Sequence, residues 1–178
     1  MTRTATALVD REGADALTLA RVAAELGVRA PSLYNHVDGL DGLRRLVALE
    51  GIDQLADACR TAVMGRAGAD AFHAMARAYR TYAVAHPGVY ALTQTARPGD
   101  QEYEQCASRL LEAVYAVLSG AGVPDDDLVH AARTVRSALH GFATFETQAG
   151  FGLDVDVDDS FTWLVDLLER SLRAGVRP

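Results

Sequence analysis

The 178-residue chain contains no lysine, only two cysteines and no long hydrophobic run. All 17 of its basic residues are arginine, which a G+C-rich genome explains most simply. No stretch of about 18 consecutive apolar residues is present, so no transmembrane helix is predicted. The chain does not open with a basic segment followed by an apolar one, so we expect no secretory signal peptide and a cytoplasmic location.

Motifs that would indicate a metal site or an enzyme are also lacking. Cys59 and Cys106 have no CxxC partner and no metal-ligand spacing, so both are predicted to be buried free thiols. There is no nucleophile elbow, phosphate-binding loop or HExxH motif. We therefore expect no cofactor, metal or catalytic site, with a small helical enzyme built from scattered histidines and carboxylates as the less favoured alternative.

The charge is distributed unevenly along the chain. Residues 1–46 carry six arginines and six acidic residues, whereas residues 47–178 carry 11 arginines and 18 acidic residues. The net charge of −7 therefore belongs entirely to the second part. This asymmetry favours an N-terminal part that can approach an anionic partner and a C-terminal part that does not.

Two short helices with a tight break are predicted between Thr18 and Val37. Thr18 is a typical N-cap residue, because its side-chain oxygen can accept a backbone N–H of the first turn. Apolar residues follow at helical spacing, and Gly27 ends the first helix because glycine adopts the left-handed conformation without steric strain. Pro31 suits the first turn of a second helix, which should run to about Val37. Val28 is expected to tuck into the angle between the helices.

Helices of about eight residues joined by a short glycine-containing turn form a helix-turn-helix motif. The second helix of such a motif reads base edges in the DNA major groove. Arg29 can pair with guanine and Asn35 with adenine, each through two hydrogen bonds. The predicted DNA-binding residues are Thr18, Arg21, Arg29, Ala30, Pro31, Ser32, Tyr34, Asn35, His36 and Arg44. An ordinary helical hairpin is the alternative interpretation of the spacing alone.

The residue order L-G-V-x-x-P-S-L-Y-x-H-V, followed by a long helix, resembles the DNA-binding domain of the TetR family of bacterial transcriptional regulators. The resemblance covers roughly Ala7 to Leu49. It implies an all-α fold of about nine helices, with a three-helix DNA-binding domain at residues 1–46 and a ligand-binding and dimerisation domain at residues 47–178. It also implies a homodimer that binds a palindromic double-stranded DNA operator.

The chain departs from the family pattern at three places. The family usually has a phosphate-binding lysine at the position of Leu40, and here Arg44 and Arg45 are candidates to replace it, or else they lie on a solvated helix face. The family's first helix usually begins further upstream, from which we expect either that the start codon is assigned late or that the chain was trimmed at this end. Some relatives carry Trp-His-Gly in the C-terminal domain, whereas this chain has Leu139-His140-Gly141.

The remaining sequence predicts helices and no strand. The predicted helical ranges are Thr2–Glu12, Leu40–Met64, Asp70–His86, Asp100–Ser119, Leu128–Ala149 and Phe161–Ala174, and Val89–Thr95 is a short apolar stretch. The last two helices are apolar on more than one side, which is typical of helices that pack on a partner. In the TetR family the last two helices form the dimer interface, and the resemblance implies the same here. The candidate interface residues are Leu139, Phe142, Phe145, Phe161, Trp163, Leu164 and Leu168.

The resemblance further implies an apolar pocket for a small-molecule effector of unknown identity. Candidate polar residues facing it are Tyr79, Tyr82, His86, Tyr90, Tyr103 and His140, with an ordinary core of satisfied hydroxyls and imidazoles as the alternative. The sequence therefore predicts a ligand-responsive, DNA-binding repressor. A helical interaction protein with weak or lost DNA binding is the alternative function.

Overall fold

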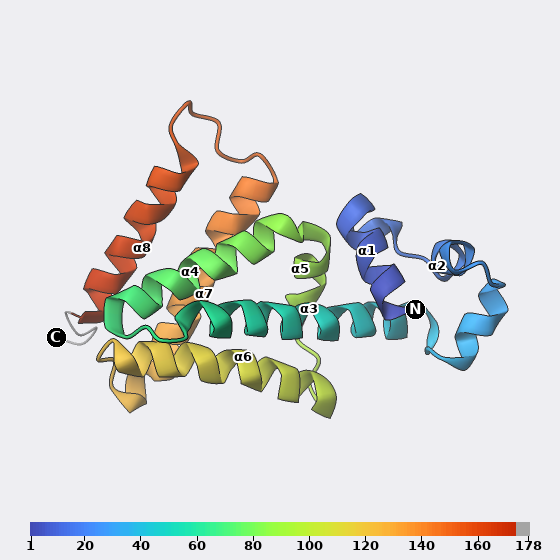
Figure 1. Ribbon diagram of the computed structural model, residues 1–178, viewed down its shortest axis with the longest axis horizontal. Helices are drawn as coiled ribbons and strands as arrows, with labels where there is room; N and C mark the ends of the chain where they lie inside the picture. The colour runs from blue at the N-terminus through green and yellow to red at the C-terminus, as the bar shows by residue number, and fades with distance from the viewer. Residues whose placement is uncertain (174–178) are drawn as a thin grey trace. The chain divides into compact units, whose positions relative to one another are not determined.

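The computed structural model describes residues 1–173, and in this part of the chain all regular secondary structure is helical, with no strand (Figure 1). The α-helices are α1 (Thr2–Glu12), α2 (Leu19–Leu26), α3 (Gly39–Val63), α4 (Gly68–Ala85), α5 (Pro87–Thr93), α6 (Gln101–Gly120), α7 (Leu128–Thr147) and α8 (Val157–Arg173). Three 3₁₀ segments are η1 (Ala14–Ala16), η2 (Ala30–Asn35) and η3 (Asp125–Asp127). The all-α prediction is confirmed, and within residues 1–173 η2 and the eight α-helices agree with the predicted number of about nine.

Most predicted helix ends lie within two residues of the observed ones. The largest difference is at α8, which begins four residues before the predicted Phe161, because Asp158 and Asp159 belong to its first turn. Carboxylates are favourable there, since they complement the partial positive charge of a helix N-terminus. The predicted last residue of that helix, Ala174, lies outside the described residues. None of the helices within residues 1–173 has the length and apolarity needed to cross a membrane.

Contacts divide the chain into two compact units, each made of two stretches of sequence. Unit 1 contains Met1–Gln54 and His86–Ala107, and unit 2 contains Leu55–Ala85 and the described residues from 108 to 173. Helices α3 and α6 each contribute residues to both units. The sequence predicts a boundary between residues 46 and 47, which separates a DNA-binding domain from a ligand-binding and dimerisation domain. This functional boundary stays a prediction.

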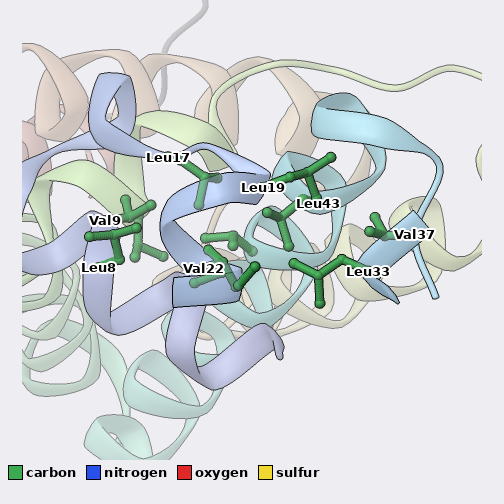
Figure 2. Packing of buried hydrophobic residues seen from close by; sticks show 12 residues of the cluster. Leu8, Val9, Leu17, Leu19, Val22, Leu33, Val37 and Leu43 are labelled. Atoms are coloured by element: carbon green, nitrogen blue, oxygen red, sulfur yellow. The ribbon is translucent and has the colours of Figure 1, made fainter. Parts of the chain in front are cut away.

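Unit 1 has a core in which α1, α2, η2, α5 and the start of α3 meet. Figure 2 shows apolar side chains gathered between these elements. The buried members are Ala5, Leu8, Val9, Leu17, Leu19, Val22, Ala23, Leu33, Val37, Leu43, Val47 and Val89. Burying one Leu or Val side chain stabilises a fold by about 1.5–3 kcal/mol, so this cluster is what fixes α2 and η2 in place.

Helix α5 belongs to this core although it lies far along the sequence. Val89 is fully buried in the cluster, and Gly88 packs directly on α1: a Cβ at Gly88 would lie 2.5 Å from the carbonyl oxygen of Val9. Beside this contact, Nδ1 of His86 lies 2.7 Å from Oδ2 of Asp10. A short helix from the middle of the chain is therefore part of the N-terminal unit.

A second cluster in unit 1 connects α3 with the first turns of α6. It contains Ala48, Leu49, Ile52, Tyr103 and Cys106. The Tyr103 hydroxyl lies 3.0 Å from the carbonyl oxygen of Thr93 and 2.8 Å from that of Thr95. The hydroxyl donates its one proton to these carbonyl oxygens and so stabilises the connection between α5 and α6.

Unit 2 contains α4, α7 and α8, which pack on one another. Arg80 of α4 joins all three: its Nε and Nη2 donate to the two carboxylate oxygens of Glu146 at 2.7 Å each, and Nη1 lies 2.7 Å from Oδ1 of Asp158. Its guanidinium carbon also lies 4.7 Å from the centroid of the Phe161 ring. The side chain is 16% exposed, so this ion pair has more structural weight than a fully solvated one.

Both cysteines are buried thiols, as predicted, and no disulfide joins them. Burial raises the pKa of the Cys59 thiol to about 12, so this thiol stays protonated and unreactive at neutral pH.

Candidate nucleic-acid interface

The first helix of the predicted motif is bounded as its sequence predicts. The Thr18 side chain accepts the backbone N–H of Arg21 at 3.2 Å and so caps α2. At the other end Gly27 has φ 67° and ψ 26°, and the N–H groups of Gly27 and Val28 donate to Ala24 and Ala23. This is a Schellman ending, in which the left-handed glycine satisfies the last carbonyls of the helix.

Two apolar side chains at this end are more exposed than predicted. Val28 is 46% exposed and Leu26 37% exposed, so Val28 does not tuck into the angle between the helices. Leu33 and Val37 are the residues of the motif after Gly27 that join the core, at 4% and 8% exposed.

The predicted second α-helix is a 3₁₀ segment, η2, over Ala30–Asn35. The N–H of Ser32 donates to Arg29 and that of His36 to Leu33, which is three-residue spacing. Such tight turns are usual in pieces too short to build a ladder of four-residue hydrogen bonds. Pro31 lies in the first turn, where its missing N–H leaves no bond unmade, as predicted.

The threefold repeat of η2 decides which side chains face outward. Residues three apart lie on one side of a 3₁₀ helix, so Ala30 and Leu33 share the inner side and contact the core. Pro31 with Tyr34, and Ser32 with Asn35, share the two outer sides. All four are exposed, Tyr34 by 62%, and His36 is exposed directly after the segment.

Arg29 directly precedes this segment and is also exposed. Its backbone is extended, at φ −82° and ψ 139°. Within residues 1–173, no carboxylate lies at ion-pair distance from its guanidinium. Arg29 therefore combines the position predicted for base contact with a cation that no acidic side chain of the described chain neutralises.

Arg21, the predicted contact on α2, is in contrast held by an acidic residue. Its Nη2 lies 2.5 Å from Oε2 of Glu12, and Oε1 of the same carboxylate lies 3.1 Å from Nη2 of Arg11. Arg11 also pairs with Glu25. The hydrogen bonds from Arg21 and then Arg11 lower the pKa of Glu12, so Glu12 is ionised at neutral pH.

The two arginines at the start of α3 differ in the same way. Arg45 binds Asp100 through Nε and Nη2, at 2.5 and 2.6 Å, and Glu102 through Nη2 at 2.9 Å. The Arg45 hydrogen bonds lower the pKa of Asp100 to about 2. The Arg45 side chain is only 28% exposed and its guanidinium is bound by two carboxylates, so Arg45 does not lie on a solvated helix face. Its role as a replacement for the family lysine stays a prediction. Arg44 is half-buried, with an Nε that is buried and without a hydrogen bond within the described chain.

These ion pairs were missed by the sequence analysis, because their partners are far apart along the chain. Asp41 and Arg97 form a further one, with N–O distances of 3.1 and 3.2 Å, between the start of α3 and the segment before α6. The only local signal was a cluster of charges at residues 97–104, which also fits an ordinary solvated loop.

The predicted effector residues are divided between the two units. Tyr79, Tyr82 and His140 belong to unit 2, and His86, Tyr90 and Tyr103 belong to unit 1. The four tyrosines are buried, and the two histidines are half-buried. His86 and Tyr103 already have the partners given above. Burial, followed by the charge of Arg136, lowers the pKa of His140, so its imidazole is neutral at pH 7.

The predicted dimer residues also divide, here by exposure. Phe145 and Trp163 are 59% and 64% exposed. Phe142, Leu164 and Leu168 are half-buried. Leu139 and Phe161 are 2% and 3% exposed, so they belong to the core of unit 2, in which α4, α7 and α8 pack on one another, and not to its surface. Sequence reasoning missed Phe151, Leu153 and Val155, exposed apolar residues of the α7–α8 loop.

An N-capped helix, a left-handed glycine and a short outward-facing segment held by one core define a helix-turn-helix regulator. Comparison with known proteins agrees. A family model described as the tetracyclin repressor-like C-terminal domain matches residues 72–168. The HTH-type transcriptional regulator Rv0681 of Mycobacterium tuberculosis is 43% identical over 159 residues, which are 88% of this chain and 72% of that protein.

Solved structures share the fold over nearly the whole chain. A possible TetR family transcriptional regulator from Streptomyces coelicolor A3(2) has a TM-score of 0.77 and 25% identity, covering 99% of this chain and 98% of that one. BioQ in complex with its double-stranded DNA operator has a TM-score of 0.72 and 25% identity, covering 97% and 95%. The chain therefore belongs to the TetR family of transcriptional regulators, and not to a family of enzymes.

Proposed function

We propose that the protein is a ligand-responsive repressor that binds a palindromic operator as a homodimer. The proposal of DNA binding rests mainly on the segment from Arg29 to Asn35. One side of this segment is anchored in the core by Leu33, while its polar side chains are exposed. The structural neighbour BioQ, which was solved with its operator, supports this use of the fold.

Each exposed group of the motif has a distinct task in this proposal. Arg29 pairs with guanine and Asn35 with adenine in the major groove. Tyr34 and His36 bind the flanking phosphates and position the motif. Thr18 begins α2, whose first-turn N–H groups and partial positive charge favour a phosphate. Arg21 and Arg44 add cations, Arg21 only when it leaves Glu12.

The homodimer is proposed from the exposed apolar residues of unit 2. Phe145 of α7, Trp163 and Leu167 of α8 and Leu153 of the loop between them are each at least 40% exposed. A Cβ at Gly141 of α7 would meet open space within one chain. Glycine inside a helix destabilises it by about 1 kcal/mol relative to alanine, so a close approach by a partner would explain its presence there.

The effector is proposed to be apolar with a few hydrogen-bonding groups. This rests on the resemblance, in which the helices that follow the DNA-binding domain and precede the dimer helices enclose an apolar ligand pocket. Within unit 2 the candidate contacts are the hydroxyls of Tyr79 and Tyr82 and the neutral imidazole of His140. We infer repression because it is the usual mode of regulation in the family, and we expect effector binding to lower the affinity for DNA.

The experiment is a selection from a random pool of double-stranded oligonucleotides with the purified full chain, followed by a salt titration on the selected sequence. We expect a palindrome, and an affinity that falls steeply with rising salt because bound phosphates release counterions. A matched control is Asp15→Asn, an exposed residue of η1 outside the motif. Recovery of no sequence, with weak binding that is independent of sequence, would favour the interaction protein instead.

A further inference from the structure

We propose that Glu12 is an intramolecular competitor of the DNA backbone, which holds Arg21 away from phosphate and so lowers the affinity for DNA. This inference rests on the proposed DNA-binding function, since it concerns the strength of the same interface. It identifies an acidic residue outside the helix-turn-helix motif as a determinant of that strength.

The geometry places one carboxylate between two cations. Glu12 is the last residue of α1, and Arg21 lies in the first turn of α2. Oxygen Oε2 of Glu12 is 2.5 Å from Arg21 Nη2, and Oε1 is 3.1 Å from Arg11 Nη2. Both carboxylate oxygens of Glu12 therefore bind an arginine, in the way that two oxygens of a phosphate would.

The ion pair lies where a phosphate can replace it. The Arg21 and Glu12 side chains are 44% and 33% exposed, so water and ions reach both. In a helix-turn-helix the first helix crosses the DNA backbone, and Arg21 lies in the first turn of that helix, where the partial positive charge of the helix N-terminus favours an anion. For Arg21 to bind phosphate through the same Nη2, its bond to Glu12 must break.

Glu12 opposes DNA in a second way, through its own charge. Charges within about 8–10 Å of each other are poorly screened at physiological salt, so a carboxylate bound to Arg21 repels a phosphate that approaches Arg21. The other charged groups in the network are Arg11 and Glu25, which pair with each other. Glu25 has no ion pair with Arg21, which makes it a natural comparison.

The test compares Glu12→Gln with Glu25→Gln in the full chain, on the sequence selected by the wild type. Both variants remove one negative charge from the same network, but only Glu12→Gln releases Arg21. We expect Glu12→Gln to tighten binding about two- to fivefold more than Glu25→Gln, in the range of a surface ion pair. Its affinity should also depend more steeply on salt, by about one additional phosphate contact.

A second background separates this mechanism from a general charge effect. With Arg21→Gln present, Glu12→Gln and Glu25→Gln should tighten binding equally, because no cation is left to release. Equal effects of the two variants when Arg21 is intact would overturn the proposal, as would weaker binding of Glu12→Gln with an unchanged melting temperature. If the wild type binds no DNA sequence, the proposed function fails instead, and that result is distinct from both.

Discussion

At the scale of single residues, the environment of each arginine separates the candidate DNA contacts. Arg29 has no acidic partner within residues 1–173, Arg21 is held by Glu12, and Arg45 is held by Asp100 and Glu102. Equal charges in the sequence therefore have unequal access to an external anion. Arg29 is the strongest candidate for reading a base.

Replacing Arg29 by alanine tests that assignment. We expect a loss of about 1–3 kcal/mol in binding to the selected operator, and a relaxed preference at one base pair, because two hydrogen bonds to guanine are lost. The measurement is a repeated selection with the variant, compared with Arg3→Ala in the exposed part of α1 as the control. An equal loss on every sequence would make Arg29 a phosphate contact.

Asp100→Asn tests the ion pair at the start of α3. The pKa of Asp100 in the folded chain is about 2, below its unfolded value of about 3.9. Its contribution to stability is therefore complete above the unfolded pKa and is lost as the pH falls towards 2. We expect urea unfolding to show a less stable variant at pH 7 and no difference near pH 2, whereas a constant difference would show that charge is not involved.

Capping and turn residues were predictable at this scale, and ion pairs were not. Thr18, Gly27 and Pro31 act through backbone groups a few residues away, so a single sequence contains the whole signal. Glu12 and Asp100 act through the folded arrangement, and nothing near them in sequence marks their partners.

At the scale of elements, the main differences are the tight winding of η2 and the place of α5. The sequence predicted the limits of the second motif helix but not its three-residue winding, which follows from its length and from the side chains anchored on one side. Helix α5 was predicted only as a short apolar stretch, and its packing on α1 could not be read from periodicity. The glycine at its start was the available sign, because glycine permits close approach of another backbone.

Gly88→Ala tests whether that approach holds α5 on α1. The added Cβ would lie 2.5 Å from the carbonyl oxygen of Val9, so α5 has to move. We expect a loss of about 1–3 kcal/mol in the free energy of unfolding, as for other overpacked sites. Chemical denaturation measures it, with Gly120→Ala as the control, since a Cβ at Gly120 would meet open space. Equal stability of the two variants would contradict the contact.

At the scale of the whole molecule, the account depends on a second copy of the chain. Trp163→Arg places a charge at the most exposed large hydrophobic side chain of α8, and we expect monomers because an unpaired charge cannot be buried in an apolar interface. Sedimentation velocity gives the mass, with Thr61→Arg on the exposed side of α3 as the control. A Trp163→Arg variant of unchanged dimer mass would show that α8 does not form the interface.

The sequence could predict the apolar excess of α7 and α8 but could not separate core from surface within it. Leu139 and Phe161 are buried in unit 2, whereas Trp163, two residues after Phe161, is exposed. Residues close together on one helix differ in exposure because the packing of α4 on α7 and α8 decides which side of each helix is covered.

The central claim is that two copies of the Arg29–Asn35 segment read one duplex together. Hydroxyl-radical footprinting on the selected operator tests this most directly. The account predicts two symmetric protected regions whose centres lie about 34–36 Å apart, or a multiple of it, and which disappear together in Trp163→Arg. A single asymmetric region that survives unchanged in Trp163→Arg would contradict it.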